Sequence, residues 1–287
     1  MSLGTRIRAH RVATWAAWPA WCGSCGWSSR SRSLRIAVLL VVAALMAACA
    51  GPPRGESVTG RQNVGDGAWR AIGRSVHGRE IRAATFGSGR PRVLIVGGIH
   101  GNEPEPAPGV AQLARVLKES PDRGTVLLIE DINPDGTAMG TRGNARGVDL
   151  NRNWQTANFV ASVRHGAQPK SEPETALLAS EIVAFAPEVI IVLHSIRSGP
   201  FVNFDGPARE YAQAFAQAAG ATDPRWTVRV SMGYPTPGSL GTWAGVERQI
   251  PTLTVELARG HPADLAERAV VEGTLAVLRL ARESRGE

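Results

Sequence analysis

The sequence predicts an α/β fold: a single domain with a mixed, mostly parallel, twisted sheet that carries helices on both faces. Short, almost wholly apolar segments alternate with segments of helical spacing, as expected for strands buried on both sides. Hydrophobic residues make up 43% and charged residues 20% of the 287 residues. This balance excludes wholesale disorder and allows a substantial core. Three cysteines are too few for a disulfide framework.

The first half of the expected domain supplies two strands and one helix. Residues 93–96 (VLIV) form a β-branched run that ends at two glycines. Residues 108–117 carry apolar side chains at helical spacing. Residues 126–129 (VLLI) predict a second buried strand, which ends at the turn signal NPDG at 133–136.

The second half adds two strands and three helices. The stretch SEPE at 171–174 predicts a capping box, with Ser171 at the N-cap and Glu174 reaching back, before a helix over 174–185. The remaining expected elements are the strands 189–193 and 253–255 and the helices 209–219 and 262–282.

Residues 1–48 differ from the rest of the chain and predict a secretory leader. Residues 1–35 hold six arginines and no acidic residue, and an uncharged apolar run follows at 36–50. That run is shorter than the ~20 residues that a membrane-spanning helix needs. Cleavage after residue 48 would remove six basic residues and no acidic one. Most of the net charge of +7 therefore lies in the leader, and no motif supports nucleic-acid binding.

The stretch MAAC at 46–49 resembles a bacterial lipobox, so Cys49 is the expected lipidation site. The alternative is an ordinary signal peptide that is cleaved near Ala48. In the lipoproteins that the motif resembles, an Asp after the Cys favours the inner membrane, and Ala50 stands there instead. We therefore expect a lipoprotein of the bacterial cell envelope that faces the periplasm, with the outer membrane favoured. Residues 49–64 are the expected tether, and 65–287 the expected catalytic domain.

Polar residues gather where the expected strands end. His100 and Glu103 follow the first strand, and His194 follows the third. Ligands of such sheets bind at the carboxyl ends of the strands. Two imidazoles and one carboxylate form the ligand set of a catalytic zinc site that keeps one position open for water. For His100 alone, an ordinary turn histidine would be the better interpretation, but the three residues together predict a site for one Zn²⁺ ion. The other histidines expected in the domain lie in loops and are predicted to be exposed: His77, His165 and His261.

Several ordered blocks resemble the M14 zinc carboxypeptidases and, among them, the murein peptide amidase branch. HGNE at 100–103 is followed by five blocks. The first block contains the motifs NPDG, TRGN and GVDLNRNW. The five blocks cover 133–154, 171–175 (SEPET), 193–195 (LHS), 233–243 (GYPTPGSLGTW) and 254–257 (TVEL). The resemblance spans about residues 65–282 and implies a zinc carboxypeptidase-like fold.

The resemblance also implies roles for individual residues. His100, Glu103 and His194 would bind zinc. Glu256 would be the general base that takes a proton from the attacking water and passes it to the leaving nitrogen. Arg142 would stabilise the oxyanion of the tetrahedral intermediate.

Four further residues of the blocks would bind substrate or orient a ligand. Asn151 and Arg152 would clamp a substrate carboxylate, which suits a planar guanidinium. Tyr234, 22 residues before Glu256, would be the mobile tyrosine that covers the substrate. Asp149 would accept a hydrogen bond from the far ring nitrogen of His100. Without the flanking block, a surface turn would be the preferred interpretation of 151–152. The stretch GYP at 233–235 could equally form a packed turn.

The implied reaction is hydrolysis of an amide next to a residue that bears a free carboxylate. In digestive relatives the residue 14 before the catalytic Glu reads the substrate side chain, which corresponds here to Thr242, with Gly241 beside it. Neither supplies an acid or a large apolar wall. The block at 233–243 instead implies an amidase that cleaves between γ-D-glutamate and meso-diaminopimelate in murein peptides. The alternatives are an N-acyl amino-acid deacylase of the aspartoacylase or succinylglutamate desuccinylase kind, and a lipoprotein that binds wall peptides without cutting them.

Overall fold

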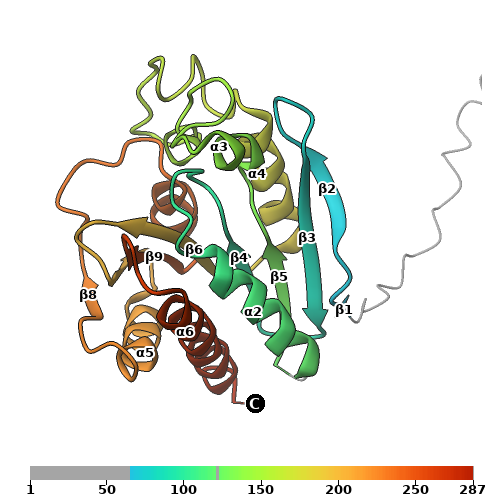
Figure 1. The fold of residues 1–287 in the computed structure, drawn as a ribbon, viewed down its shortest axis with the longest axis vertical. Helices are drawn as coiled ribbons and strands as arrows, with labels where there is room; N and C mark the ends of the chain where they lie inside the picture. The colour runs from blue at the N-terminus through green and yellow to red at the C-terminus, as the bar shows by residue number, and fades with distance from the viewer. Residues whose placement is uncertain (1–64, 121–122, 287) are drawn as a thin grey trace, which may run out of the picture. The chain divides into compact units, whose positions relative to one another are not determined.

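The computed structural model describes residues 65–120 and 123–286 (Figure 1). The predicted leader, the tether and Cys49 lie outside the described residues. The strands are β1 (Gly65–Asp66), β2 (Arg70–Arg74), β3 (Glu80–Gly87), β4 (Arg92–Val96), β5 (Thr125–Ile129), β6 (Val189–Ile196), β7 (Phe201–Asp205), β8 (Thr227–Arg229) and β9 (Thr252–Ala258). The helices are α2 (Ala107–Glu119), α3 (Pro134–Met139), α4 (Pro173–Phe185), α5 (Arg209–Gly220) and α6 (Ala263–Glu283), with short helical turns η1 (Leu150–Arg152) and η2 (Gly241–Val246).

The strands form one mixed sheet in the order β1-β3-β5-β4-β6-β9-β7-β8, with β2 also paired to β3. The central strands β5, β4, β6 and β9 are parallel to one another. Antiparallel pairings add β3 on one side and β7 on the other, and β8 pairs parallel with β7. The predicted mixed sheet is therefore present, and its central strands are the four predicted from apolar runs.

Each central strand is buried on both faces. In β4, Val93 and Ile95 belong to a hydrophobic core that includes residues of α2, α5 and α6. Leu94 and Val96 belong to a second core, with residues of α4 and η2. Figure 1 shows α2, α5 and α6 together on the near side of the sheet, with α4 on the other side. This two-sided burial explains why the central strands are mostly apolar.

Two local predictions differ from the structure. The NPDG signal begins helix α3 rather than a simple turn, with the Asn133 side chain accepting from the Gly136 N–H at 3.0 Å. The prediction of a capping box at 171–174 is wrong, because α4 has Glu172 at its N-cap and no side chain forms a capping hydrogen bond. Glu174 instead accepts hydrogen bonds from the Val76 N–H and the Asn144 side chain, both at 3.0 Å. Long-range partners thus replace the local bond that the spacing predicts.

None of the described helices is long and apolar enough to cross a lipid bilayer. The longest, α6, instead has one buried face that packs against α2 and α5. Glycines allow the close approach at both contacts. A Cβ on Gly109 of α2 would lie 2.6 Å from Val270, and a Cβ on Gly273 of α6 would lie 2.6 Å from the Phe215 ring.

Gly273→Ala is therefore expected to lower the free energy of unfolding, because overpacking costs about 1–3 kcal/mol and exceeds the ~1 kcal/mol gained in helix propensity. Gly220→Ala in α5 is the matched control, since a Cβ there meets no atom within 4 Å. It should raise the free energy of unfolding by about 0.5–1 kcal/mol. Urea unfolding of both variants measures the difference. A shift in the same direction for both would contradict the packing argument.

Candidate active site

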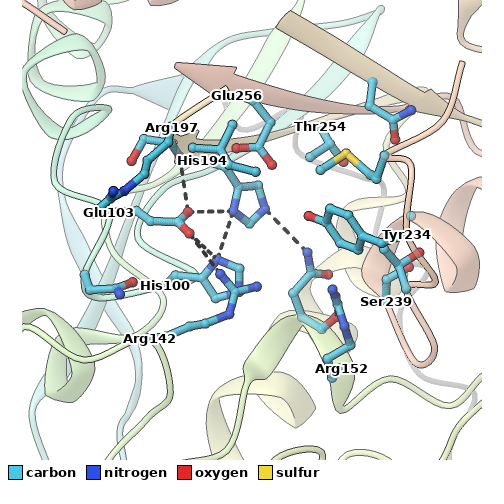
Figure 2. Close-up of a pocket in the computed structure, with 18 of the residues that line it drawn as sticks. His100, Glu103, Arg142, Arg152, His194, Arg197, Tyr234, Ser239, Thr254 and Glu256 are labelled. Atoms are coloured by element: carbon cyan, nitrogen blue, oxygen red, sulfur yellow. Dashed lines mark hydrogen bonds and ion pairs between the residues drawn. The ribbon is translucent and has the colours of Figure 1, made fainter. Parts of the chain in front are cut away.

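His100, Glu103 and His194 converge at the carboxyl ends of β4 and β6 (Figure 2). All three side chains are buried, and one ligand atom from each lies within 4.8 Å of the others. Nδ1 of His100 lies 3.1 Å from Nδ1 of His194, and the Glu103 carboxylate lies 3.0 Å and 2.9 Å from these nitrogens. Ligand atoms of a tetrahedral zinc site are ~3.3 Å apart, as Zn–N bonds of 2.0–2.1 Å require. The spacing and the donor set therefore fit a zinc ion.

Burial and charge act in opposite directions on these groups. Burial alone would lower the pKa of His100, but hydrogen bonds to Asp149 and Glu103 raise it above its usual value. Burial alone would raise the pKa of Glu103, but the two imidazoles hold it well below its usual range. A dication bound between these groups would replace the protons that the pairs now share.

The loop that carries His100 is fixed by two glycines. Gly98 has φ of 67°, in the left-handed region that favours glycine. A Cβ at Gly98 would also lie 2.2 Å from the Asp131 carboxylate. A Cβ at Gly101 would lie 1.9 Å from the backbone of Gly136, at the start of α3. The backbone thus packs too closely for any side chain at these two positions, which orients His100 towards β6.

Asp149 joins the metal cluster to the neighbouring loop. Its Oδ1 accepts from Nε2 of His100 at 2.9 Å and from the Asn151 N–H at 2.9 Å. Its Oδ2 accepts from Nε of Arg142 at 2.8 Å. Burial alone would raise the pKa of Asp149, but His100 and Arg142 lower it far below its usual range. The carboxylate therefore stays charged and fixes which His100 nitrogen faces Glu103 and His194.

Four arginines line the cavity: Arg142, Arg152, Arg197 and Arg259. Nη1 of Arg142 donates to Glu103 at 3.1 Å. Nη1 of Arg152 donates to the Asn151 carbonyl at 2.7 Å, and no carboxylate among the described residues forms an ion pair with Arg152. Burial, together with the charge of Arg142, lowers the pKa of Arg152 against the opposing effect of Asp149. A half-buried cation without a carboxylate partner is suited to an anionic ligand.

Glu256 faces the same cavity from β9. In the sheet register it lies opposite His194 of β6, and it is 5% exposed. Burial raises the pKa of Glu256 to about 7, and the charge of Glu103 adds to the effect while His194 opposes it. Tyr234, 47% exposed, stands on the side of the cavity opposite Glu103 (Figure 2).

These residues share one cavity of about 620 Å³, which brings together the predicted ligands, Glu256, Arg142, Asn151, Arg152 and Tyr234. Three expectations need correction. His194 and Glu256 lie inside β6 and β9 rather than after them, since both strands extend beyond their apolar runs. His261, predicted to be exposed, is buried, and its Nε2 lies 3.3 Å from Asp223.

The sequence-based prediction missed four polar residues of the cavity: Arg197, Asn203, Asp205 and Arg259. Asn203 and Asp205 come from β7, which the apolar pattern does not predict, since this strand alternates apolar and polar residues over only five positions. Gly241 lines the cavity, as its place in the resembling block suggests, and Asp205 lies against it. An acid is therefore present, although neither Gly241 nor Thr242 supplies it.

Comparison with known proteins agrees with this site. Residues 69–266 match the zinc carboxypeptidase family (peptidase M14), and the chain belongs to that family. Murein peptide amidase A of Vibrio campbellii is 32% identical over 184 residues, which cover 58% of this chain and 69% of the relative. Its counterpart in Escherichia coli K12 is 34% identical over 167 residues, which cover 52% of this chain and 64% of the relative. The predicted class of hydrolase is confirmed.

Solved structures agree on the fold. The murein-tripeptide amidase from Escherichia coli O157 superposes with a TM-score of 0.61 at 28% identity and covers 75% of this chain and 92% of its own. Carboxypeptidase A from Helicoverpa armigera gives a TM-score of 0.66 at 19% identity, over 77% and 69% of the two chains. The predicted fold class is confirmed.

The raised pKa of Glu256 predicts that Glu256→Gln stabilises the metal-free protein at high pH. The group titrates at about 7 in the folded state against a usual value of 4.5. The free energy of unfolding of the wild type, relative to that of the variant, is therefore highest below pH 4.5 and falls as the pH rises to 7. The loss is at most about 3 kcal/mol. Urea unfolding of chelator-treated protein between pH 4.5 and 8.5 measures it, with Glu272→Gln on the exposed side of α6 as control. A wild-type–variant difference that does not change with pH would refute the prediction.

Proposed function

We propose that the chain is a zinc-dependent amidase that cleaves the bond between γ-D-glutamate and meso-diaminopimelate in murein peptides. One observation carries the reaction type: the His100–Glu103–His194 cluster shares its cavity with Glu256, a buried carboxylate without an ion-pair partner among the described residues. The substrate class is supported by relatives named murein peptide amidase A at 32% and 34% identity.

In this proposal Glu256 moves the protons. A zinc ion held by the three ligands would lower the pKa of its water towards neutrality. Glu256 would take a proton from the attacking water as the water oxygen adds to the amide carbon, and would then give the proton to the leaving nitrogen. The C–N bond breaks and a C–O bond forms, which yields a glutamyl carboxylate and an ammonium group that carries both protons of the water. The pKa of Glu256 near 7 in the metal-free protein suits both transfers.

The arginines stabilise and orient the charged groups of the substrate. Arg142 is held by Asp149 and Glu103 through Nε and Nη1, so Nη2 remains for the oxyanion that develops on the amide oxygen. Arg152, with Asn151 beside it, binds the carboxylate next to the scissile amide. Tyr234 closes over the bound peptide from its exposed position.

The cellular location is proposed from residues 1–50 alone. We infer that the chain is exported, that Cys49 becomes lipid-modified, and that the lipid anchors the domain in the bacterial cell envelope. The domain would face the periplasm, with the outer membrane as the favoured location. Murein peptides would reach the active site there.

Labelling of cells with radioactive palmitate, followed by membrane fractionation, tests the anchor. Wild type and the control Cys25→Ser should carry label and sediment with the outer membrane, whereas Cys49→Ser should lose both properties. A Cys49→Ser protein that still carries label would refute the anchor. An unlabelled, cleaved wild-type protein would favour the ordinary signal peptide.

Hydrolysis is tested with purified protein and L-Ala-γ-D-Glu-meso-diaminopimelate. We expect release of diaminopimelate, seen by mass spectrometry, that stops with a chelator and returns with zinc. Glu256→Gln should lower kcat by about 10²–10⁴-fold, and the control Glu272→Gln should not. Binding without release would favour the non-catalytic alternative, and turnover of N-acetylaspartate or N-succinylglutamate in its place would favour the deacylase. Full activity of Glu256→Gln would refute the mechanism.

A further inference from the structure

One arginine of the cavity wall has no partner of its own. Arg197 lies in the loop after β6, three residues beyond His194, and its side chain is exposed. Within the described part of the chain, its guanidinium forms no hydrogen bond, ion pair or stacking contact with an aromatic ring. The other three arginines of the cavity each donate to a carbonyl or a carboxylate. Arg197 is therefore the cavity cation that is free to bind a ligand.

Arg259 lies next to Arg197 at the same edge of the sheet. In the parallel pair of β6 and β9, Ile196 lies opposite Ala258, and the Arg259 N–H donates to the Ile196 carbonyl at 3.0 Å. Each arginine thus directly follows one member of an aligned pair, and both line the cavity. Two guanidinium groups from adjacent strand ends can donate to the same carboxylate.

The guanidinium of Arg259 is held beside the metal ligands. Its Nη1 donates to the Asn102 carbonyl and lies 3.8 Å from the Glu105 carboxylate, and its Nη2 lies 3.8 Å from Glu103. These contacts still leave 32% of the side chain exposed. An anion that bridges Arg197 and Arg259 would therefore lie close to the metal site.

Arg197 and Arg152 lie on opposite sides of the metal ligands (Figure 2). Tyr234 stands on the same side as Arg152. In the proposed reaction Arg152 binds the carboxylate on the amine side of the scissile bond, and the amide carbonyl lies at the metal. The acyl part of the substrate therefore extends away from Arg152, towards Arg197.

A γ-linked glutamate carries an anion on this acyl side. Because its side-chain carboxyl group forms the amide, the α-carboxylate stays free and lies four C–C bonds, at most about 6 Å, from the scissile carbon. An acyl residue linked through its α-carboxyl group has no free carboxylate on its backbone. We propose that Arg197, together with Arg259, is a specificity residue that binds this α-carboxylate. The inference rests on the proposed function, and it names the acyl group that is recognised.

Isothermal titration calorimetry with two tripeptides tests this assignment. L-Ala-γ-D-Glu-meso-diaminopimelate has the free α-carboxylate, and its counterpart with D-isoglutamine carries a neutral amide there. Zinc-loaded Glu256→Gln protein, in which turnover is blocked, is titrated with each peptide. It should bind the carboxylate peptide about 10-fold more tightly, because the amide loses the charged hydrogen bonds to arginine.

Further variants in the same background assign the preference to Arg197. Arg197→Gln should remove the preference without weakening the binding of the isoglutamine peptide, and Arg197→Lys should retain part of it. Arg279→Gln, which changes an exposed arginine of α6 outside the cavity, is the matched control and should keep the preference. Because Arg197 is exposed, its substitutions leave the core intact.

Equal affinity for the two peptides, or an unchanged preference in the Arg197→Gln variant, would overturn the assignment of Arg197. If wild type hydrolyses the murein peptide in that case, the assignment alone is refuted and the proposed function stands. A 10-fold preference without hydrolysis by wild type would instead refute the proposed function and support the acyl-side site. No binding of either peptide would overturn both.

Discussion

The carboxylate of Asp149 accepts hydrogen bonds from three separate parts of the site. It holds the His100 ring at 2.9 Å, the backbone of Asn151 at 2.9 Å and the guanidinium of Arg142 at 2.8 Å. The loop after β4, the loop that contains Arg142 and the turn that carries Arg152 therefore cannot shift independently. Because these donors lower the pKa of Asp149 so far, the charge that holds them together persists across the physiological pH range.

The same cavity places its acidic groups in different environments. Glu103 and Asp149 contact imidazoles and a guanidinium, and their pKa values lie far below the usual range. Glu256 and Asp205 have no such partner, and burial raises the pKa of each. Paired carboxylates remain anionic and hold cations, whereas unpaired ones can exchange protons or accept a charged ligand. The contrast in environment divides these four acidic side chains into two that contact cations and two that do not.

The sequence predicts the centre of the fold better than its margins. Apolar runs locate β4, β5, β6 and β9, because strands buried on both faces are mostly apolar. The flanking strands β3 and β7 alternate exposed and buried positions or are short, so they were not predicted, and Asp205 was missed with β7. The cluster of His100, Glu103 and His194 was predicted because parallel strands end at one edge. Glu174 and His261 contact residues that are distant in the sequence, so no local sequence pattern predicts these contacts.

Anomalous diffraction at the zinc absorption edge, from crystals of the zinc-loaded protein, tests the central claim most directly. The account predicts one strong peak about 2.0–2.3 Å from Nδ1 of His100, Nδ1 of His194 and the Glu103 carboxylate, with Asp149 still bonded to Nε2 of His100. A peak at any other set of residues, or a metal bound to Nε2 of His100 with Asp149 displaced, would contradict it.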